Sequence, residues 1–218
     1  SSLSSSSAAS DVYKRQRLPS ARTRGFLGSH RCRAPQYASR RARYELYSHV
    51  FVDESKVGGY YVAASAVAAG DVNRARKAVR SLALPGPKRI HFTDERDDRR
   101  KKLLKEFSAL DTVVNVYVAR GLRDKEARPL CLGALARDAA ASGADHLSVE
   151  KDESSYAHDK KIIGQALQSS ENRPRYDFPR AHEEPLLWVS DAVAWCYQKR
   201  GRWTGLAAPL VADVVELT

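Results

Sequence analysis

The chain has 218 residues, with 37 basic and 26 acidic side chains and a formal net charge of +11 at pH 7. No apolar run approaches the roughly 18 residues of a membrane span, so the sequence excludes a helical membrane protein. The three cysteines, Cys32, Cys131 and Cys196, form no C-x-x-C pair and no zinc-type cluster with His, which is typical of a reduced, cytoplasmic protein.

The first 43 residues differ in composition from the rest of the chain. Seven of the first ten residues are Ser, and the stretch DVYKRQ at 11–16 resembles a transposon-end sequencing adapter translated in frame. We therefore expect residues 1–16 to be an adapter-derived artefact; a genuine low-complexity tail is the alternative. Because the sequence contains no Met, we expect that it does not begin at its own start codon. Residues 17–43 have neither a 3.6- nor a 2-residue period and are expected to be disordered or non-native.

The high net charge belongs mostly to this N-terminal region. Residues 1–43 hold ten basic side chains and one acidic side chain, which leaves 27 basic and 25 acidic side chains, a net charge of +2, for residues 44–218. A basic protein often binds nucleic acid, but this domain's charge balance does not support that inference.

Residues 44–218 are enough for one domain with its own core. Aromatic and β-branched runs predict strands, and apolar residues at helical spacing predict helices. The expected strands are 46–53, 60–69, 89–92, 112–119 and 145–150, with a short extended piece at 176–179. One expected helix follows Asp71, its N-cap, and four others cover 94–110, 124–142, 155–167 and 185–199. A last amphipathic stretch is expected at 206–217.

A hairpin followed by alternating helices and strands implies an α/β fold. Its mixed sheet is antiparallel early and parallel later, with helices on both faces.

Acidic residues stand where two predicted strands end. Asp53 and Glu54 close the first strand, and because successive strand residues point to opposite faces, only one of them serves a given site. Glu150 closes the strand at 145–150. Strand ends of open α/β sheets are where sites are usually built, although an acidic pair after a strand is often only the start of a turn.

Asp191 is a third acidic candidate, on the predicted helix 185–199. Its helical neighbours are Leu187, Trp188, Ala194 and Trp195. A carboxylate on so apolar a surface needs a hydrogen-bond partner or a cation. Clustered carboxylates favour Mg²⁺ or Mn²⁺, which prefer hard oxygen ligands and promote phosphodiester hydrolysis. P-loop, dinucleotide-binding, serine-hydrolase and zinc-protease motifs are absent from the sequence.

Two segments resemble a widespread, uncharacterised bacterial family with a ribonuclease H-like fold, whose most similar members are actinobacterial. They are FVDES at 51–55 and EEPLLWVSDAVAWCYQ at 183–198. The resemblance implies a five-stranded mixed sheet of order 3-2-1-4-5 over residues 44–218, with carboxylates gathered at its centre. It implies catalytic and metal-binding roles for Asp53, Glu150 and Asp191, with Glu54 as a further metal ligand and His158 and Asp159 as auxiliary groups.

Two features depart from that pattern. Ribonuclease H places its second acid on a helix, whereas Glu150 ends a strand. No evident basic patch is present for the phosphate backbone, although Arg89, Arg96, Arg99, Arg100 and the group Arg173, Arg175 and Arg180 are candidates. His91, His182 and Glu183 are candidates to line the site without a defined role.

Three hypotheses remain open at this point. The first is a Mg²⁺- or Mn²⁺-dependent nuclease that hydrolyses DNA or RNA. The second is a non-catalytic ribonuclease H-like module that binds nucleic acid or protein, in which the carboxylates are spread apart or neutralised by Lys and Arg. The third is a metal-dependent hydrolase of a small phosphoester. The sequence does not specify an oligomeric state.

Overall fold

The computed structural model describes residues 48–218. The expectations for residues 1–16 and 17–43, and for a domain start at Tyr44, therefore lie outside the described residues. None of the helices within residues 48–218 is long and apolar enough to span a membrane.

The described chain forms six strands and six α-helices, joined by short 3₁₀ turns. The strands are β1 (Ser48–Ser55), β2 (Tyr60–Ala68), β3 (Thr112–Ala119), β4 (His146–Val149), β5 (Arg175–Asp177) and β6 (Val211–Leu217). The helices are α2 (Val72–Ser81), α3 (Asp97–Ser108), α4 (Asp124–Ala141), α5 (Tyr156–Leu167), α6 (Leu187–Lys199) and α7 (Arg202–Ala207). The 3₁₀ turns are η2 (Ala69–Asp71), η3 (Phe92–Asp94) and η4 (Ala208–Leu210).

The strands form one mixed sheet of order β5-β4-β1-β2-β3-β6. β1 pairs antiparallel with β2 and parallel with β4, β2 pairs antiparallel with β3, and β4 pairs parallel with β5. The predicted α/β class and mixed sheet are confirmed. The order β3-β2-β1-β4-β5 is the one that the ribonuclease H-like resemblance implies.

The expected number of strands, five, is wrong, because β6 adds a sixth beside β3 and parallel to it. Residues 206–217 are expected to be one amphipathic stretch, whereas the structure divides them between the end of α7, η4 and β6. An edge strand is covered on one side only, and most of β6 is partly or fully exposed. Its alternation of apolar and polar residues is therefore weak.

The expected strand at 89–92 is also absent. Arg89 and Ile90 lie in the connection after α2, and Phe92 begins η3. The apolar run there follows Pro85-Gly86-Pro87 and is too short to pair along a neighbouring strand. Asp71 immediately precedes α2, but its side chain makes no capping bond and pairs with Arg74 instead.

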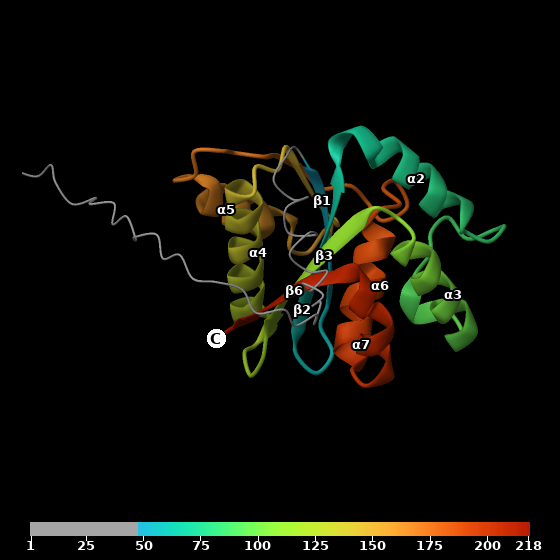
Figure 1. Cartoon of the computed structure of the whole chain (residues 1–218). Coiled ribbons are helices and arrows are strands. Elements are labelled where there is room, and N and C mark those ends of the chain that lie inside the picture. The colour runs from blue at the N-terminus through green and yellow to red at the C-terminus, as the bar shows by residue number, and fades with distance from the viewer. Residues whose placement is uncertain (1–47) are drawn as a thin grey trace, which may run out of the picture. The chain divides into compact units, whose positions relative to one another are not determined.

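Helices cover both faces of the sheet (Figure 1). The alternation of β1 sends Phe51 to one face and Val50 and Val52 to the other. Phe51 belongs to the core formed with α2, α3, α6 and α7, and Val50 and Val52 belong to the core formed with α4 and α5. Each face of β1 therefore looks into a separate apolar core.

Helix α6 is fixed to the middle of the sheet by buried hydroxyl groups. Ser190 Oγ donates to the carbonyl of Phe51 at 2.8 Å and is hydrogen-bonded to Ser65 Oγ at 2.8 Å. Further along, Ser55 Oγ donates to Gln198 Oε1 at 3.2 Å. These bonds align α6 with β1 in the same direction, which brings the residue after Ser190 close to the carboxyl end of the strand.

The β1–β2 turn offers a test of backbone strain without packing changes. Gly58 has φ of +72°, whereas Gly70 does not have a left-handed φ, and a Cβ added at either glycine meets nothing within 4 Å. We expect Gly58→Ala to lower the free energy of unfolding by about 1–2 kcal/mol, because an L side chain is disfavoured in that region. Gly70→Ala is the matched control and should raise stability by up to about 1 kcal/mol. Urea denaturation measures both, and equal effects would contradict the assigned backbone conformation.

Candidate carboxylate site

Asp53 lies near the carboxyl end of β1, on the face covered by α6. It is opposite Ala63 of β2 and two residues beyond Phe51, and both of these residues belong to the core on the α6 side. Its Oδ1 accepts a hydrogen bond from the backbone N–H of Glu54 at 2.6 Å. The strand thus presents one of its two terminal acids to α6.

Glu150 reaches the same place from the neighbouring parallel strand. Its backbone N–H donates to the carbonyl of Val52 at 2.9 Å, which continues the pairing of β4 with β1. Its side chain hydrogen-bonds to the Asp53 side chain and accepts from Arg89 Nη1 at 3.2 Å. The carboxyl ends of β1 and β4 therefore bring two acids into direct contact.

Asp191 adds a carboxylate from α6, directly after the Ser190 anchor. Its Oδ2 accepts a hydrogen bond from the backbone N–H of Phe92 at 2.9 Å, so the η3 turn fixes its orientation. Electrostatic interactions also join Asp191 to Glu150, Arg89 and His91. The structure thus brings together the three acids that the resemblance singled out, here called the carboxylate centre.

Simultaneous ionisation of all three acids in the carboxylate centre is unfavourable. Burial raises the pKa of Asp53 well above its ordinary value, and the charges of Asp191 and Glu150 and the bond to Glu150 raise it further. Burial also raises the pKa of Asp191, against the lowering effect of the Phe92 N–H and of the His91 and Arg89 charges. Neighbouring acids that oppose each other's ionisation favour a proton or a cation between them.

The chemistry of the donors fits a hard divalent cation. All three side chains offer carboxylate oxygens, which Mg²⁺ and Mn²⁺ prefer, and they converge from β1, from the end of β4 and from α6. Within residues 48–218, however, no three His, Cys, Asp or Glu side chains have the spacing of a coordinated ion. The residues therefore fit such an ion in the type of their donor atoms, and binding would require the three side chains to come closer together.

Glu54 points to the opposite face of β1. It binds Arg128 Nη1, accepts from the Tyr60 hydroxyl and pairs with Lys56 Nζ at 2.8 Å. Burial and the Glu54 charge raise the pKa of Tyr60, so its hydroxyl remains a donor. The structure does not bring Glu54 together with the carboxylate centre.

Asp159 belongs to this same opposite-face network. Asp159 is completely buried and accepts from Arg128 Nε at 2.6 Å and Nη2 at 2.7 Å, and from Ser155 Oγ at 3.0 Å. His158 is exposed on α5. Arg128 thus links Glu54 of β1 and Asp159 of α5 to α4.

The connection between α2 and α3 supplies further residues of the site: Arg89, expected as a phosphate-backbone contact, His91, expected without a defined role, and Phe92, which was not expected. Arg89 contacts Glu150, the charge of His91 acts on Asp191, and Phe92 donates its backbone N–H. Arg100 holds this connection by donating from Nε to the Phe92 carbonyl at 2.9 Å. Ile90 and Phe92 are buried, so the connection is packed against the core. The alternation of these apolar residues with Arg89 and His91 was the sequence signal that could have identified it.

Arg100 is itself held by aromatic packing. Its guanidinium lies 4.3 Å from the centroid of the Trp195 ring, and Nη2 donates to the Thr93 carbonyl at 2.6 Å. Phe92 packs edge-on against the same Trp195 ring at 5.3 Å. The η3 turn is therefore fixed on α6, one turn of helix beyond Asp191.

These features define an α/β protein with an acidic site at the carboxyl ends of two adjacent parallel strands. No protein-family model matches the sequence, and no curated protein matches it. The resemblance to a bacterial family therefore stays a prediction.

Remote similarity to solved structures is present. A chain in the structure of the PCNA:RNase HII complex from Archaeoglobus fulgidus is 13% identical over 71% of this chain and 73% of that one, with a TM-score of 0.48. Bst-RNase HIII in complex with Mn²⁺ is 14% identical over 77% of this chain and 57% of that one, with a TM-score of 0.42. A mutant Bst-RNase HIII is also 14% identical, over 85% and 58%, with a TM-score of 0.38. The chain spans little more than half of either Bst-RNase HIII chain, and the fold is assigned here from strand order and direction.

The raised pKa of Asp53 makes the stability of the cation-free protein depend on pH. The contribution of this group is fully present below the ordinary Asp pKa of 3.8 and is lost as the pH rises through the raised folded-state value. We expect Asp53→Asn to raise the melting temperature near neutral pH in the presence of EDTA, because the amide carries no charge at any pH. The gain should shrink as the pH falls toward the ordinary Asp value.

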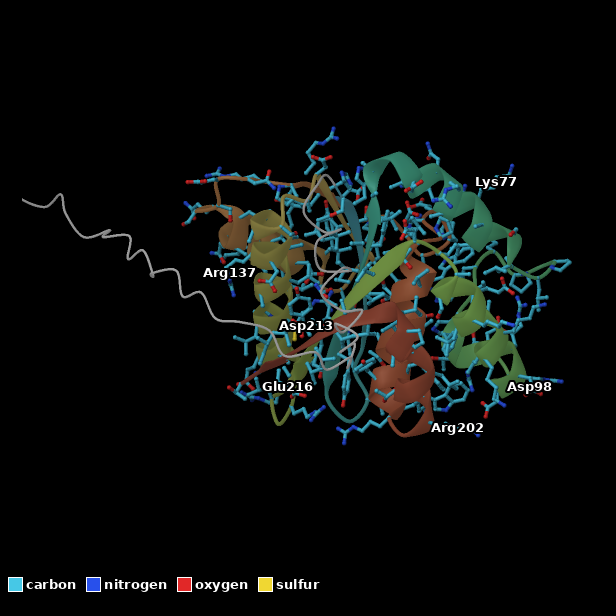
Figure 2. All side chains as sticks on the ribbon, viewed as in Figure 1. Lys77, Asp98, Arg137, Arg202, Asp213 and Glu216 are labelled. Carbon is cyan, nitrogen blue, oxygen red and sulfur yellow. The ribbon has the colours of Figure 1, made fainter. Side chains whose placement is uncertain are left out.

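Thermal melts across this pH range measure the effect. The control is Asp98→Asn on the outer surface of α3 (Figure 2), whose side chain is 99% exposed. A wild-type protein more stable than Asp53→Asn in neutral EDTA buffer would contradict the raised pKa.

The opposite-face network predicts a large structural effect. Arg128→Met should lower the free energy of unfolding by about 3–5 kcal/mol, because it leaves buried Asp159 without its cation. The double variant Arg128→Met/Asp159→Asn should recover part of the loss. Arg74→Met, which removes an exposed pair with Asp71, should cost less than about 1 kcal/mol. Chemical denaturation compares the three variants, and equal losses for Arg128→Met and Arg74→Met would mean that the network is solvated.

Proposed function

We propose that this protein is a divalent-metal-dependent hydrolase that cleaves phosphodiester bonds of DNA or RNA. The convergence of Asp53, Glu150 and Asp191, with the raised pKa of two of them, is the observation that carries the proposal. Buried acids that only stabilise a fold are normally matched by cations, as Asp159 is by Arg128. Among residues 48–218, one ion pair reaches the carboxylate centre, from partly exposed Arg89 to Glu150.

The three carboxylates would hold Mg²⁺ or Mn²⁺, and each is positioned by a different part of the fold. Asp53 and Glu150 are fixed through the pairing of β1 with β4, and Asp191 through the Phe92 N–H. A bound divalent cation supplies a water of lowered pKa and offsets negative charge on the phosphate. His91, whose Nδ1 is bonded to Asp94 at 2.9 Å, lies near Asp191 as a group able to accept or release a proton.

The second candidate is a ribonuclease H-like module without catalysis. The ion pair between Arg89 and Glu150 favours it, because that pair already neutralises part of the carboxylate centre. It predicts no gain of stability from Mg²⁺ or Mn²⁺ and no cleavage, and binding to nucleic acid or protein that is unchanged by removal of the acids.

A nuclease assay with metal titration tests the first candidate. The full chain is incubated with labelled DNA, RNA and DNA–RNA duplexes in Mg²⁺ or Mn²⁺, beside Asp53→Asn, Glu150→Gln and Asp191→Asn. Each substitution should lower the cleavage rate by at least about 100-fold, because each removes a ligand of the cation. Asp98→Asn should cleave at the wild-type rate.

Thermal shift accompanies the assay. Mn²⁺ should raise the melting temperature of the wild-type protein and leave that of Asp191→Asn unchanged. Cleavage by Asp53→Asn at the wild-type rate would refute the assignment. Absence of both cleavage and metal stabilisation in the wild-type protein would favour the non-catalytic module.

A further inference from the structure

Arg89 is the one basic side chain in direct contact with the carboxylate centre. Within residues 48–218, no other Lys, Arg or His hydrogen-bonds or forms an ion pair with Asp53, Glu150 or Asp191. Arg89 Nη1 lies 3.2 Å from Glu150 Oε1. A cation bound through Glu150 Oε1 would compete with Arg89 for that oxygen.

Arg89 is held much more weakly than the structural arginine on the other face. Among the described residues its guanidinium makes this single bond to Glu150, and its side chain is 37% exposed. Arg128 bonds through Nε, Nη1 and Nη2 and its side chain is 8% exposed. A guanidinium that bonds through one nitrogen keeps its other N–H donors for another partner.

The backbone beside Arg89 is anchored while its side chain is not. The next residue, Ile90, is buried, and Phe92 is fixed by its N–H bond to Asp191 and by Arg100. The guanidinium can therefore change partner by side-chain rotation and stay beside the site.

Charge decides when that change is favourable. A divalent cation and Arg89 compete for the same carboxylate of Glu150, and the cation brings two charges to acids that one arginine neutralises only in part. Once released, a planar guanidinium fits two oxygens of a phosphate, the charge pattern of the proposed substrate.

We propose that Arg89 exchanges partners: it pairs with Glu150 when no divalent cation is bound, and it binds a backbone phosphate of the nucleic-acid substrate when the carboxylate centre holds the cation. This inference rests on the proposed function and assigns to it a substrate-binding residue and a built-in competitor of the metal.

Calorimetric titration of Mn²⁺ into the full chain tests the first half. Arg89→Met should bind Mn²⁺ about two- to fivefold more tightly than the wild-type protein, because no exposed ion pair has to be broken first. Arg89→Lys keeps a charge and should lie between them. The matched control is Arg120→Met, which removes an exposed pair of the same length, 3.2 Å, to Glu216 of β6 (Figure 2) and should bind Mn²⁺ like the wild-type protein.

Binding of a nucleic acid that resists hydrolysis tests the second half. Fluorescence anisotropy follows a labelled phosphorothioate duplex in Mg²⁺ over a range of salt concentrations. Arg89→Met should weaken binding about tenfold and lower the salt slope of log K by about 0.9, the value for one phosphate contact. Arg120→Met should change neither quantity.

The outcomes separate the two proposals. A wild-type protein that binds no Mn²⁺ overturns the metal-dependent hydrolase, and the exchange fails with it. A wild-type protein that binds Mn²⁺ while Arg89→Met behaves like Arg120→Met in either assay overturns the exchange alone. Tighter metal binding together with weaker duplex binding and a smaller salt slope supports the exchange.

Discussion

Mutual repulsion of Asp53, Glu150 and Asp191 is the constraint on which the site depends, and the protein overcomes it with backbone bonds. The Glu150 N–H binds the Val52 carbonyl, and the Phe92 N–H binds Asp191. Ser190 ties α6 to β1 through the Phe51 carbonyl. These bonds hold the acids together although burial and proximity disfavour their ionisation.

The two faces of β1 treat a buried acid in opposite ways. On the α4 and α5 side, Arg128 binds Glu54 and Asp159 through all three guanidinium nitrogens, so the charges are matched and the elements are locked together. On the α6 side, Arg89 offers a single bond to Glu150. Burial alone therefore does not distinguish the two groups of acids; the number of bonds made by the nearest arginine does.

The local sequence pattern predicted the strands and helices whose periodicity is strong. It missed the elements whose conformation depends on their neighbours in the fold. Thr112–Ala119 was predicted to the residue because its β-branched run is buried on both faces. β6 was missed because an edge strand alternates weakly. The three acids were predicted from strand ends and from an apolar helix. Their placement on one face of the sheet, like the pairing of Glu54 and Asp159 through Arg128, depends on long-range contacts that no single segment encodes.

The adjacency of Asp53 and Glu54 has a consequence for sequence divergence. In β1 each residue has a fixed partner on β2, so inserting or deleting one residue within the strand would exchange the two faces for every side chain beyond it. Glu54 would then meet Glu150 and Asp191, and Asp53, one methylene shorter, would have to satisfy Arg128. One insertion or deletion would therefore disrupt both the carboxylate centre and the Arg128 network. Insertions and deletions in proteins descended from this sequence should consequently occur in the turn at 56–59 and be absent from β1.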